Sequence, residues 1–275
     1  MKKLFDIPGY ILLILLLSGS VQAQTFNADY VHKLYAKYPT VKSDLCPACK
    51  EWINPIYKSI ADTFEHRPVV TFYIYTNEHR LSQEKFEANY KAGKRDNTAF
   101  DRSGVFAGWH PVTEQPELAK VYSAINKPIK KTIDKMVWGH CQAWILLAYC
   151  QDGAILSDTE DFNEGMEIQG QNVGTEIATE EHCRELLKSG KTTSINIWCG
   201  TYGNQGSATD GKIIVVIPAY YWKIIQYTDA NGKSITEAWW MPNKVTETTA
   251  FLPQRISTPD QIIKNIGFDP QKILF

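Results

Sequence analysis

The sequence lacks an apolar run long enough to cross a membrane, since Tyr10–Leu17 falls well short of the roughly 20 residues that a spanning helix needs. It also lacks an excess of charge of either sign, because 29 lysines and arginines stand against 30 aspartates and glutamates. This balance excludes a protein that coats nucleic acid through bulk charge, although a local basic groove remains possible. There are no internal repeats or low-complexity segments. With 275 residues, 44% of them hydrophobic, one or two domains with a full core are expected.

The first residues have the pattern of a cleavable secretory signal, which we expect to cover residues 1–23. Lys2 and Lys3 supply the positive start, Tyr10–Leu17 the apolar centre, and Val21–Ala23 the small-residue cleavage site. No cysteine follows the cleavage site to accept a lipid. The sequence therefore predicts a secreted or periplasmic protein.

The cysteines point to an oxidising compartment. An even number in an exported chain favours disulfides, whose connectivity cannot be read from sequence. Cys46-Pro-Ala-Cys49 could be a redox pair, but no apolar strand precedes it, so a structural disulfide is favoured. The sequence has no second CxxC and no histidine pair at zinc-site spacing. The six cysteines are Cys46, Cys49, Cys141, Cys150, Cys183 and Cys199.

The apolar patterns predict an α+β fold. Residues 25–66 carry aromatic and aliphatic side chains at helical spacing, and Val69–Thr76 is a dense β-branched and aromatic run that predicts a strand. Strands on both sides of a helical centre favour an α+β domain over a doubly wound one. Other expected elements are helix or loop over 77–100, helix over 114–136, a strand over 192–203, two strands over 211–243 joined at Asn231-Gly232, and a capped helix over 257–268.

The central stretch carries the polar residues most suggestive of chemistry. Asn172, Glu176, Glu180 and Arg184 fall four apart, which would align them along one ridge of a helix. His140, ahead of this ridge, could complete a site that combines a metal and a base. The alternatives are a surface Glu180–Arg184 ion pair, worth only about 0.3–0.5 kcal/mol, and a core histidine.

The order of several motifs resembles the DNA/RNA non-specific endonucleases of the ββα-metal (His-Me finger) superfamily over roughly residues 69–243. The resemblance implies a nuclease-like domain over 69–275, a mixed sheet with flanking helices, preceded by a helical extension with the CxxC motif over 24–68. The motifs are YIYT at 73–76, Arg102-x-x-x-Phe106, Gly139-His140, Asn172-x-Gly174, Cys199-Gly-Thr-Tyr202, Pro218 with Lys223, and Met241-Pro-Asn243.

The resemblance also implies roles for individual residues. His140 matches the family's general base and Asn172 the ligand of a single divalent ion. Glu180 matches a glutamate that holds metal-bound water, and Arg184 an arginine that contacts phosphate. Such a site would hydrolyse phosphodiester bonds of DNA and RNA without reading bases, with one Mg²⁺ or Mn²⁺ ion.

Two weaker matches and two departures accompany these roles. Asn163 matches a second family asparagine near the site, and Arg102 an upstream arginine that helps to stabilise the phosphate. The family has Asp-Arg-Gly-His where this chain has Val137–His140, so Trp138 replaces a phosphate-binding arginine. The family's Pro-Gln after the earlier asparagine is also missing. Activity could therefore be low, altered or absent.

Two other functions remain open. Gly139-His140-Cys141 before an apolar segment resembles the start of transglutaminase-like and papain-like thiol enzymes, in which Cys141 would be the nucleophile and His182 or His110 its partner. A disulfide from Cys141 to Cys150 or Cys183 would make that thiol inert. The third reading is an inactive binding module on the nuclease fold.

Overall fold

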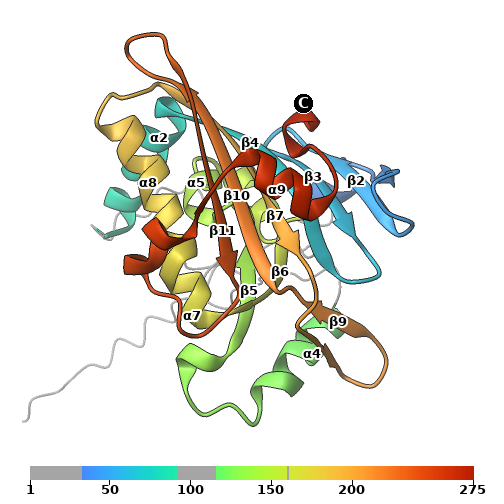
Figure 1. Ribbon diagram of the computed structural model, residues 1–275. Coiled ribbons are helices and arrows are strands. Elements are labelled where there is room, and N and C mark those ends of the chain that lie inside the picture. Colours follow the sequence, from blue (N-terminus) through green and yellow to red (C-terminus); the bar gives the residue numbers. More distant parts are fainter. Residues whose placement is uncertain (1–32, 92–115, 160) are drawn as a thin grey trace, which may run out of the picture.

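The computed structural model describes residues 33–91, 116–159 and 161–275. An eight-stranded antiparallel sheet runs through it in the order β1-β2-β3-β4-β7-β10-β11-β12 (Figure 1). Two hairpins, β5–β6 and β8–β9, form separate two-stranded sheets. Among the described helices, none has the length and apolar character needed to cross a membrane. The expected signal segment and Arg102 lie outside the described residues.

The strands of the main sheet are β1 (Val41–Lys42), β2 (Cys49–Ile53), β3 (Lys58–Asp62), β4 (Arg67–Thr76), β7 (Ser194–Tyr202), β10 (Tyr220–Thr228), β11 (Ser234–Pro242) and β12 (Ile256–Ser257). The hairpin strands are β5 (Met136–His140), β6 (Glu164–Ile168), β8 (Gly206–Thr209) and β9 (Ile214–Ile217). The helices are α2 (Asn77–Lys91), α4 (Pro116–Asn126), α5 (Trp144–Leu147), α6 (Gln151–Ser157), α7 (Gln169–Gln171), α8 (Ile177–Lys188) and α9 (Pro259–Ile266). Short turns η1 (Thr132–Asp134), η2 (Asn172–Glu176), η3 (Thr249–Arg255) and η4 (Pro270–Lys272) complete the described elements.

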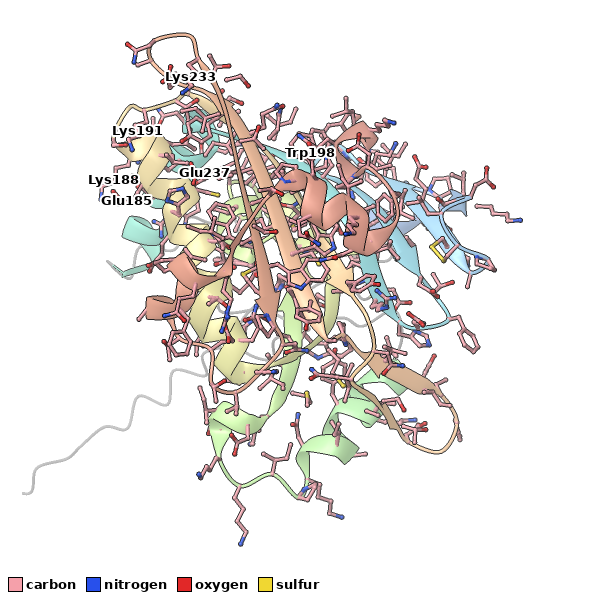
Figure 2. All side chains as sticks on the ribbon, in the orientation of Figure 1. Glu185, Lys188, Lys191, Trp198, Lys233 and Glu237 are labelled. Carbon is pink, nitrogen blue, oxygen red and sulfur yellow. A yellow bond between two sulfur atoms is a disulfide. The ribbon has the colours of Figure 1, made fainter. Side chains whose placement is uncertain are left out.

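The sheet separates two apolar layers. Tyr221 and Ile225 of β10 pack with the layer that contains α5, α6 and α8, whereas Trp222 and Ile224 pack with the layer that contains α9. This alternation is what a strand buried on both faces requires. Figure 2 shows Trp198 of β7 near α9, where its indole Nε1 donates to the carbonyl of Ile273 at 2.9 Å and ties the last residues to the sheet.

Several predicted elements are confirmed. The α+β class is correct, and the strand predicted at Val69–Thr76 lies within β4. Gly232 takes φ +80° at the turn between β10 and β11. Thr258 caps α9 by accepting a hydrogen bond from the Gln261 N–H at 3.2 Å. The region 211–243 contains three strands instead of the expected two, because β9 ends before Pro218 and turns away from β10.

The helical prediction for residues 25–66 is wrong over residues 41–62, which form β1, β2 and β3 of the main sheet. Pro55 lacks the N–H that a helix interior needs. Asn54 Oδ1 instead accepts from the N–H groups of Ile56 and Tyr57, both at 2.9 Å, and closes the turn between β2 and β3. The predicted domain boundary at residue 68 therefore falls inside β4, in one continuous sheet.

The structural disulfide predicted for the CxxC motif is present between Cys46 and Cys49, at the start of β2. Cys141, Cys150, Cys183 and Cys199 are free thiols. The disulfides from Cys141 to Cys150 or Cys183 that the sequence allowed are therefore not formed.

The predicted polar ridge is not one regular helix. Gly174 leaves helical geometry, with φ −101° and ψ −110°, so η2 and α8 meet at a kink. A Cβ at Gly174 would lie 2.6 Å from the carbonyl oxygen of Glu247, so a side chain there would prevent the close approach of η3. Asn172 consequently lies before the kink, while Glu180 and Arg184 lie on α8.

Candidate active site

The β5–β6 hairpin positions the residues that the sequence singled out. Its register pairs His140 with Glu164 and Gly139 with Gly165. A Cβ at Gly139 would lie 2.2 Å from Oε2 of Glu167, which packs across it. Glycine is therefore required next to His140 because the Glu167 side chain occupies that space.

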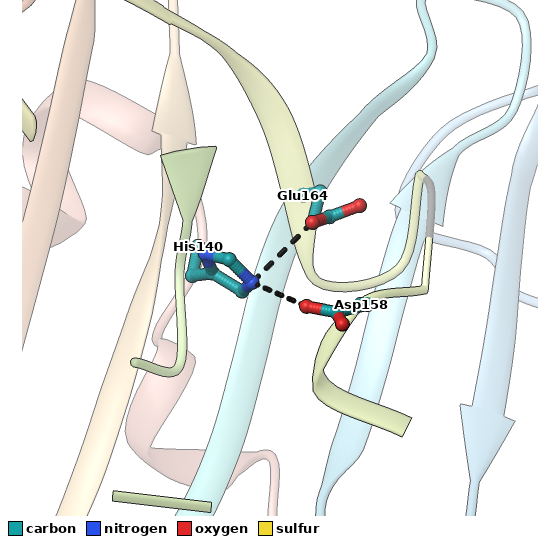
Figure 3. Close-up of side chains that lie close together, drawn as sticks. All are labelled: His140, Asp158 and Glu164. Carbon is teal, nitrogen blue, oxygen red and sulfur yellow. Dashed lines mark hydrogen bonds and ion pairs between the residues drawn. The ribbon is translucent and has the colours of Figure 1, made fainter. Parts of the chain in front are cut away.

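His140 lies between two carboxylates (Figure 3). Its Nε2 is 3.0 Å from Oδ1 of Asp158, at the end of α6, and 3.3 Å from Oε1 of Glu164 on β6. One donor atom from each of the three residues lies within 4.8 Å of the other two. This group could hold a metal ion, or the carboxylates could hold the imidazole in a fixed orientation.

The surroundings of this group are largely closed to solvent. The side chains of His140, Asp158 and Glu164 are 13%, 9% and 0% exposed. Burial raises the pKa of Asp158, and the hydrogen bond with His140 opposes that rise. Because the two atoms that face Nε2 are carboxylate oxygens, the tautomer with the proton on Nε2 is favoured. Within the described part of the chain, Nδ1 of His140 has no hydrogen-bond partner.

Asn163 braces the loop that presents His140 and Asp158. Its Oδ1 accepts from the Gln142 N–H, and its Nδ2 donates to the carbonyls of Gln142 and Ser157, each at 2.8 Å. The residue is completely buried. These contacts lock the backbone on both sides of the histidine–carboxylate group, and they give Asn163 a positioning role.

Asn172 belongs to a second polar cluster. Its Nδ2 donates to Oε2 of Glu167 at 3.0 Å, which directs the amide oxygen away from that carboxylate. Glu167 is fully buried, and burial followed by the nearby Glu176 raises its pKa well above the usual value. Asn172 Oδ1 has no hydrogen-bond partner among the described residues.

Lys223, on the face of β10 that α8 covers, neutralises the charge of Glu176 in this cluster. Its Nζ donates to Oε1 of Glu176 and, at 2.8 Å, to Oγ1 of Thr179. Glu180, half-buried on α8, has its pKa raised to about 8, chiefly by burial and against the opposing charge of Lys223. The Glu176–Lys223 pair joins the polar ridge to the sheet.

The two clusters meet at Gly139 but do not merge. Side chains alternate along a strand, so His140 and Glu164 project from one face of the hairpin while Glu167 projects from the other. No hydrogen bond or ion pair in the described part of the chain joins His140 to Asn172. The structure thus brings Asn172 together with Glu167, and His140 together with Asp158.

Of the two arginines that the sequence suggests for phosphate binding, the structure describes only Arg184. Arg184 is half-buried on α8, and its positive charge opposes the rise that burial causes in the pKa values of Tyr75 and Glu180. Arg102 lies outside the described residues. Trp138, where the resemblance would place an arginine, stacks its ring on Tyr122 of α4 with centroids 3.7 Å apart.

The structure gives no support to Cys141 as a nucleophile. The residue is buried, and burial raises the pKa of its thiol well above the usual value, whereas a nucleophilic cysteine needs a lowered pKa. His182 instead contacts Glu237 at 2.8 Å (Figure 2 labels Glu237), and His110 lies outside the described residues.

Sequence reasoning missed Asp158, Glu164 and Glu167. Glu164 directly follows Asn163, but no strand was predicted there, so its pairing with His140 across β5 and β6 had no signal in the sequence. Asp158 had no signal either, because its approach to His140 across 18 positions depends on how α6 ends.

The comparisons with known proteins agree with this fold. Residues 161–265 match the family model of the DNA/RNA non-specific endonucleases. The whole fold is similar to a chain from the crystal structure of the EndoG/EndoGI complex, with a TM-score of 0.55 and 17% identity over 80% of this chain and 86% of that one. No curated protein matches the sequence. The matched sequence region, together with the shared fold around it, supports the resemblance to the DNA/RNA non-specific endonucleases.

Proposed function

We propose that the protein is an exported, metal-dependent endonuclease that hydrolyses phosphodiester bonds of DNA and RNA without sequence preference. The observation that carries this proposal is the contact of His140 Nε2 with Asp158 at 3.0 Å and Glu164 at 3.3 Å. An imidazole anchored through one nitrogen presents the other in a fixed direction. The phosphodiester substrates are inferred from the family.

His140 is the general base in this proposal. With the N–H of Nε2 hydrogen-bonded to Asp158, the Nδ1 lone pair removes a proton from the attacking water. The adjacent carboxylates stabilise the imidazolium that results, so the proton remains on the ring until the phosphodiester bond has broken. General-base catalysis of this kind accounts for roughly 10²–10⁴-fold in rate.

The cation of this proposal binds at Asn172. The carboxamide oxygen of Asn172 is directed away from Glu167, and Glu180 lies close enough to Glu167 for its charge to raise the pKa of that carboxyl. Amide and carboxylate oxygens of this kind are the donors that Mg²⁺ or Mn²⁺ prefers. The histidine–carboxylate group suits Mg²⁺ less well, because Mg²⁺ binds imidazole nitrogen weakly. When bound, the ion neutralises the charge that develops on the phosphate. Glu180 orients water in this arrangement.

Phosphate binding is assigned to Arg184 and Arg102. A guanidinium binds two phosphate oxygens at once, which orients the substrate without contact to a base. Asn163 positions the loop that presents His140 and Asp158 through its three hydrogen bonds.

The test is digestion of supercoiled DNA and of RNA by the protein with Mg²⁺, Mn²⁺ or a chelator. Cleavage that needs the metal, and that His140→Ala reduces by roughly 10²-fold or more, would support the proposal. Loss of activity on thiol blocking instead would indicate the Cys141 enzyme. No cleavage by a folded protein that still binds nucleic acid would indicate a binding module.

A further inference from the structure

We propose that His140, Asp158 and Glu164 form a binding site for Zn²⁺ or a similar transition-metal ion, distinct from the Mg²⁺ position at Asn172. Zn²⁺ combines readily with imidazole nitrogen and carboxylate oxygen, and three protein ligands with one water complete its coordination. The site therefore has the composition of a three-ligand zinc centre.

The separations between the donor atoms match this ion. Bonds of about 2.0–2.2 Å in a tetrahedral arrangement put neighbouring ligand atoms roughly 3.3–3.6 Å apart. Nε2 of His140 is 3.0 Å from Asp158 Oδ1 and 3.3 Å from Glu164 Oε1, and all three atoms lie within 4.8 Å of one another. Binding of an ion requires the donor atoms to shift by only a few tenths of an ångström.

The three ligands are held by rigid elements. The β5–β6 register fixes His140 opposite Glu164. Asn163 fixes the end of α6, next to Asp158, through its 2.8 Å hydrogen bond to the Ser157 carbonyl. Little conformational freedom is lost on binding. The two buried carboxylates also supply the negative charge that a divalent ion neutralises (Figure 3).

Occupation of this site would switch the base off, a consequence that rests on the proposed function. A Zn²⁺ ion takes the lone pair of Nε2, so the single proton of the neutral ring moves through solvent from Nε2 to Nδ1. The Nδ1 lone pair is then no longer free to accept a proton from water. The same residues thus position the base when the metal is absent and block it when Zn²⁺ is bound.

Binding is measured on the full chain, without nucleic acid, by calorimetric titration with Zn²⁺ and by the visible spectrum of bound Co²⁺. One ion is expected to bind, with affinity lowered roughly 10- to 100-fold or more in His140→Gln, Asp158→Asn and Glu164→Gln. The Co²⁺ complex should be four-coordinate and lack a thiolate charge-transfer band, which separates this site from the free cysteines.

His182→Gln is the matched control, because it removes another histidine that contacts a carboxylate, Glu237, at 2.8 Å. It should bind Zn²⁺ as the wild type does. If the wild type binds no Zn²⁺, or if folded Glu164→Gln and Asp158→Asn both bind it unchanged, the proposed site is wrong. These outcomes do not depend on nuclease activity. A chain that binds Zn²⁺ at this site but cleaves no nucleic acid would contradict the proposed function alone.

Discussion

His66 and Asp161, the two non-glycine residues with positive φ in the described part of the chain, contact each other. Their φ angles are 55° and 65°, and His66 Nδ1 is 3.1 Å from Asp161 Oδ1. Left-handed backbone is unfavourable for residues that have a Cβ. The contact joins the turn before β4 to the loop between α6 and β6, so it supports both strained conformations and the loop that follows Asp158.

This pair predicts a pH-dependent contribution to stability. The hydrogen bond with Asp161, and then the charges of Asp161, Asp62 and Glu117, raise the pKa of His66 against the effect of burial. A raised histidine pKa stabilises the fold fully below the unfolded value of about 6.5 and loses this effect as pH rises through the folded value. Asp161→Asn should therefore lower the melting temperature below pH 6.5 and have a smaller effect above it. The introduced asparagine tolerates positive φ, so the backbone of the loop is kept.

The difference at low pH should be about 1 kcal/mol or less, as for other partly exposed pairs, or roughly 2–4 °C. Melting curves of the wild type and Asp161→Asn across the range would measure it. His66→Asn is the control, because it also tolerates positive φ and should remove the same pH dependence. An equal loss of stability at every pH would contradict the assignment.

The contact between His140 and Asp158 predicts a loss of turnover when the carboxylate is removed. Asp158→Asn should lower kcat by roughly 10- to 100-fold with little change in KM, because substrate contacts remain while the imidazolium loses its stabilising charge. Glu164→Gln should have a smaller effect, since its oxygen lies 3.3 Å from Nε2 and that of Asp158 lies 3.0 Å away. An effect on KM alone would contradict the positioning role.

Local sequence patterns were sufficient to predict much of the fold. Val69–Thr76 formed a strand because its apolar residues are buried on both faces, and Thr258 capped a helix because its hydroxyl meets a free N–H. The helical prediction is wrong over residues 41–62, because the spacing of the aromatic residues there fits a short helix as well as strands. Pro55 was the local signal against a helix there.

The candidate site was predictable only where its residues are close in sequence. His140 and Asn172 were found from motifs, but their partners depend on tertiary structure. Glu164 meets His140 through strand register, and Asp158 through the end of α6. The kink at Gly174 lies against Glu247 and Thr248, some seventy positions later, and helical spacing alone carries no sign of this contact.

Glu167 is predicted to orient Asn172, the proposed metal ligand. Replacement by leucine removes the acceptor for the Asn172 Nδ2 and frees the amide to rotate. The Mg²⁺ affinity of Glu167→Leu should fall by roughly 10- to 100-fold, as for other partners of metal ligands. Glu167→Gln keeps an acceptor at the same place and should restore most of that affinity. Calorimetric titration with Mg²⁺ would measure both, and equal affinities in the two variants would refute the positioning role.

The buried pair Lys223–Glu176 should matter strongly for stability. The two side chains are each 2% exposed, and removing one charge leaves the other without its partner. Lys223→Met should therefore lower the free energy of unfolding by about 3–5 kcal/mol. The double variant Lys223→Met/Glu176→Gln should be more stable than the single one, because no uncompensated charge remains. Denaturant unfolding would compare them, and two equally unstable variants would indicate that packing dominates.

Under the proposed function, Trp138 stands where the resemblance places a phosphate-binding arginine, so Trp138→Arg should raise cleavage of plasmid DNA in Mg²⁺. The planar guanidinium can stack on Tyr122 as the indole does, with its positive charge on the His140 face of the hairpin. Some stability should be lost with the indole, about 1–3 kcal/mol, so activity is compared well below the melting temperature. Trp138→Gln, a polar residue without charge, is the control for that loss. Higher cleavage in the arginine variant alone would support the assigned register, whereas unchanged or lower cleavage by a folded Trp138→Arg would contradict it.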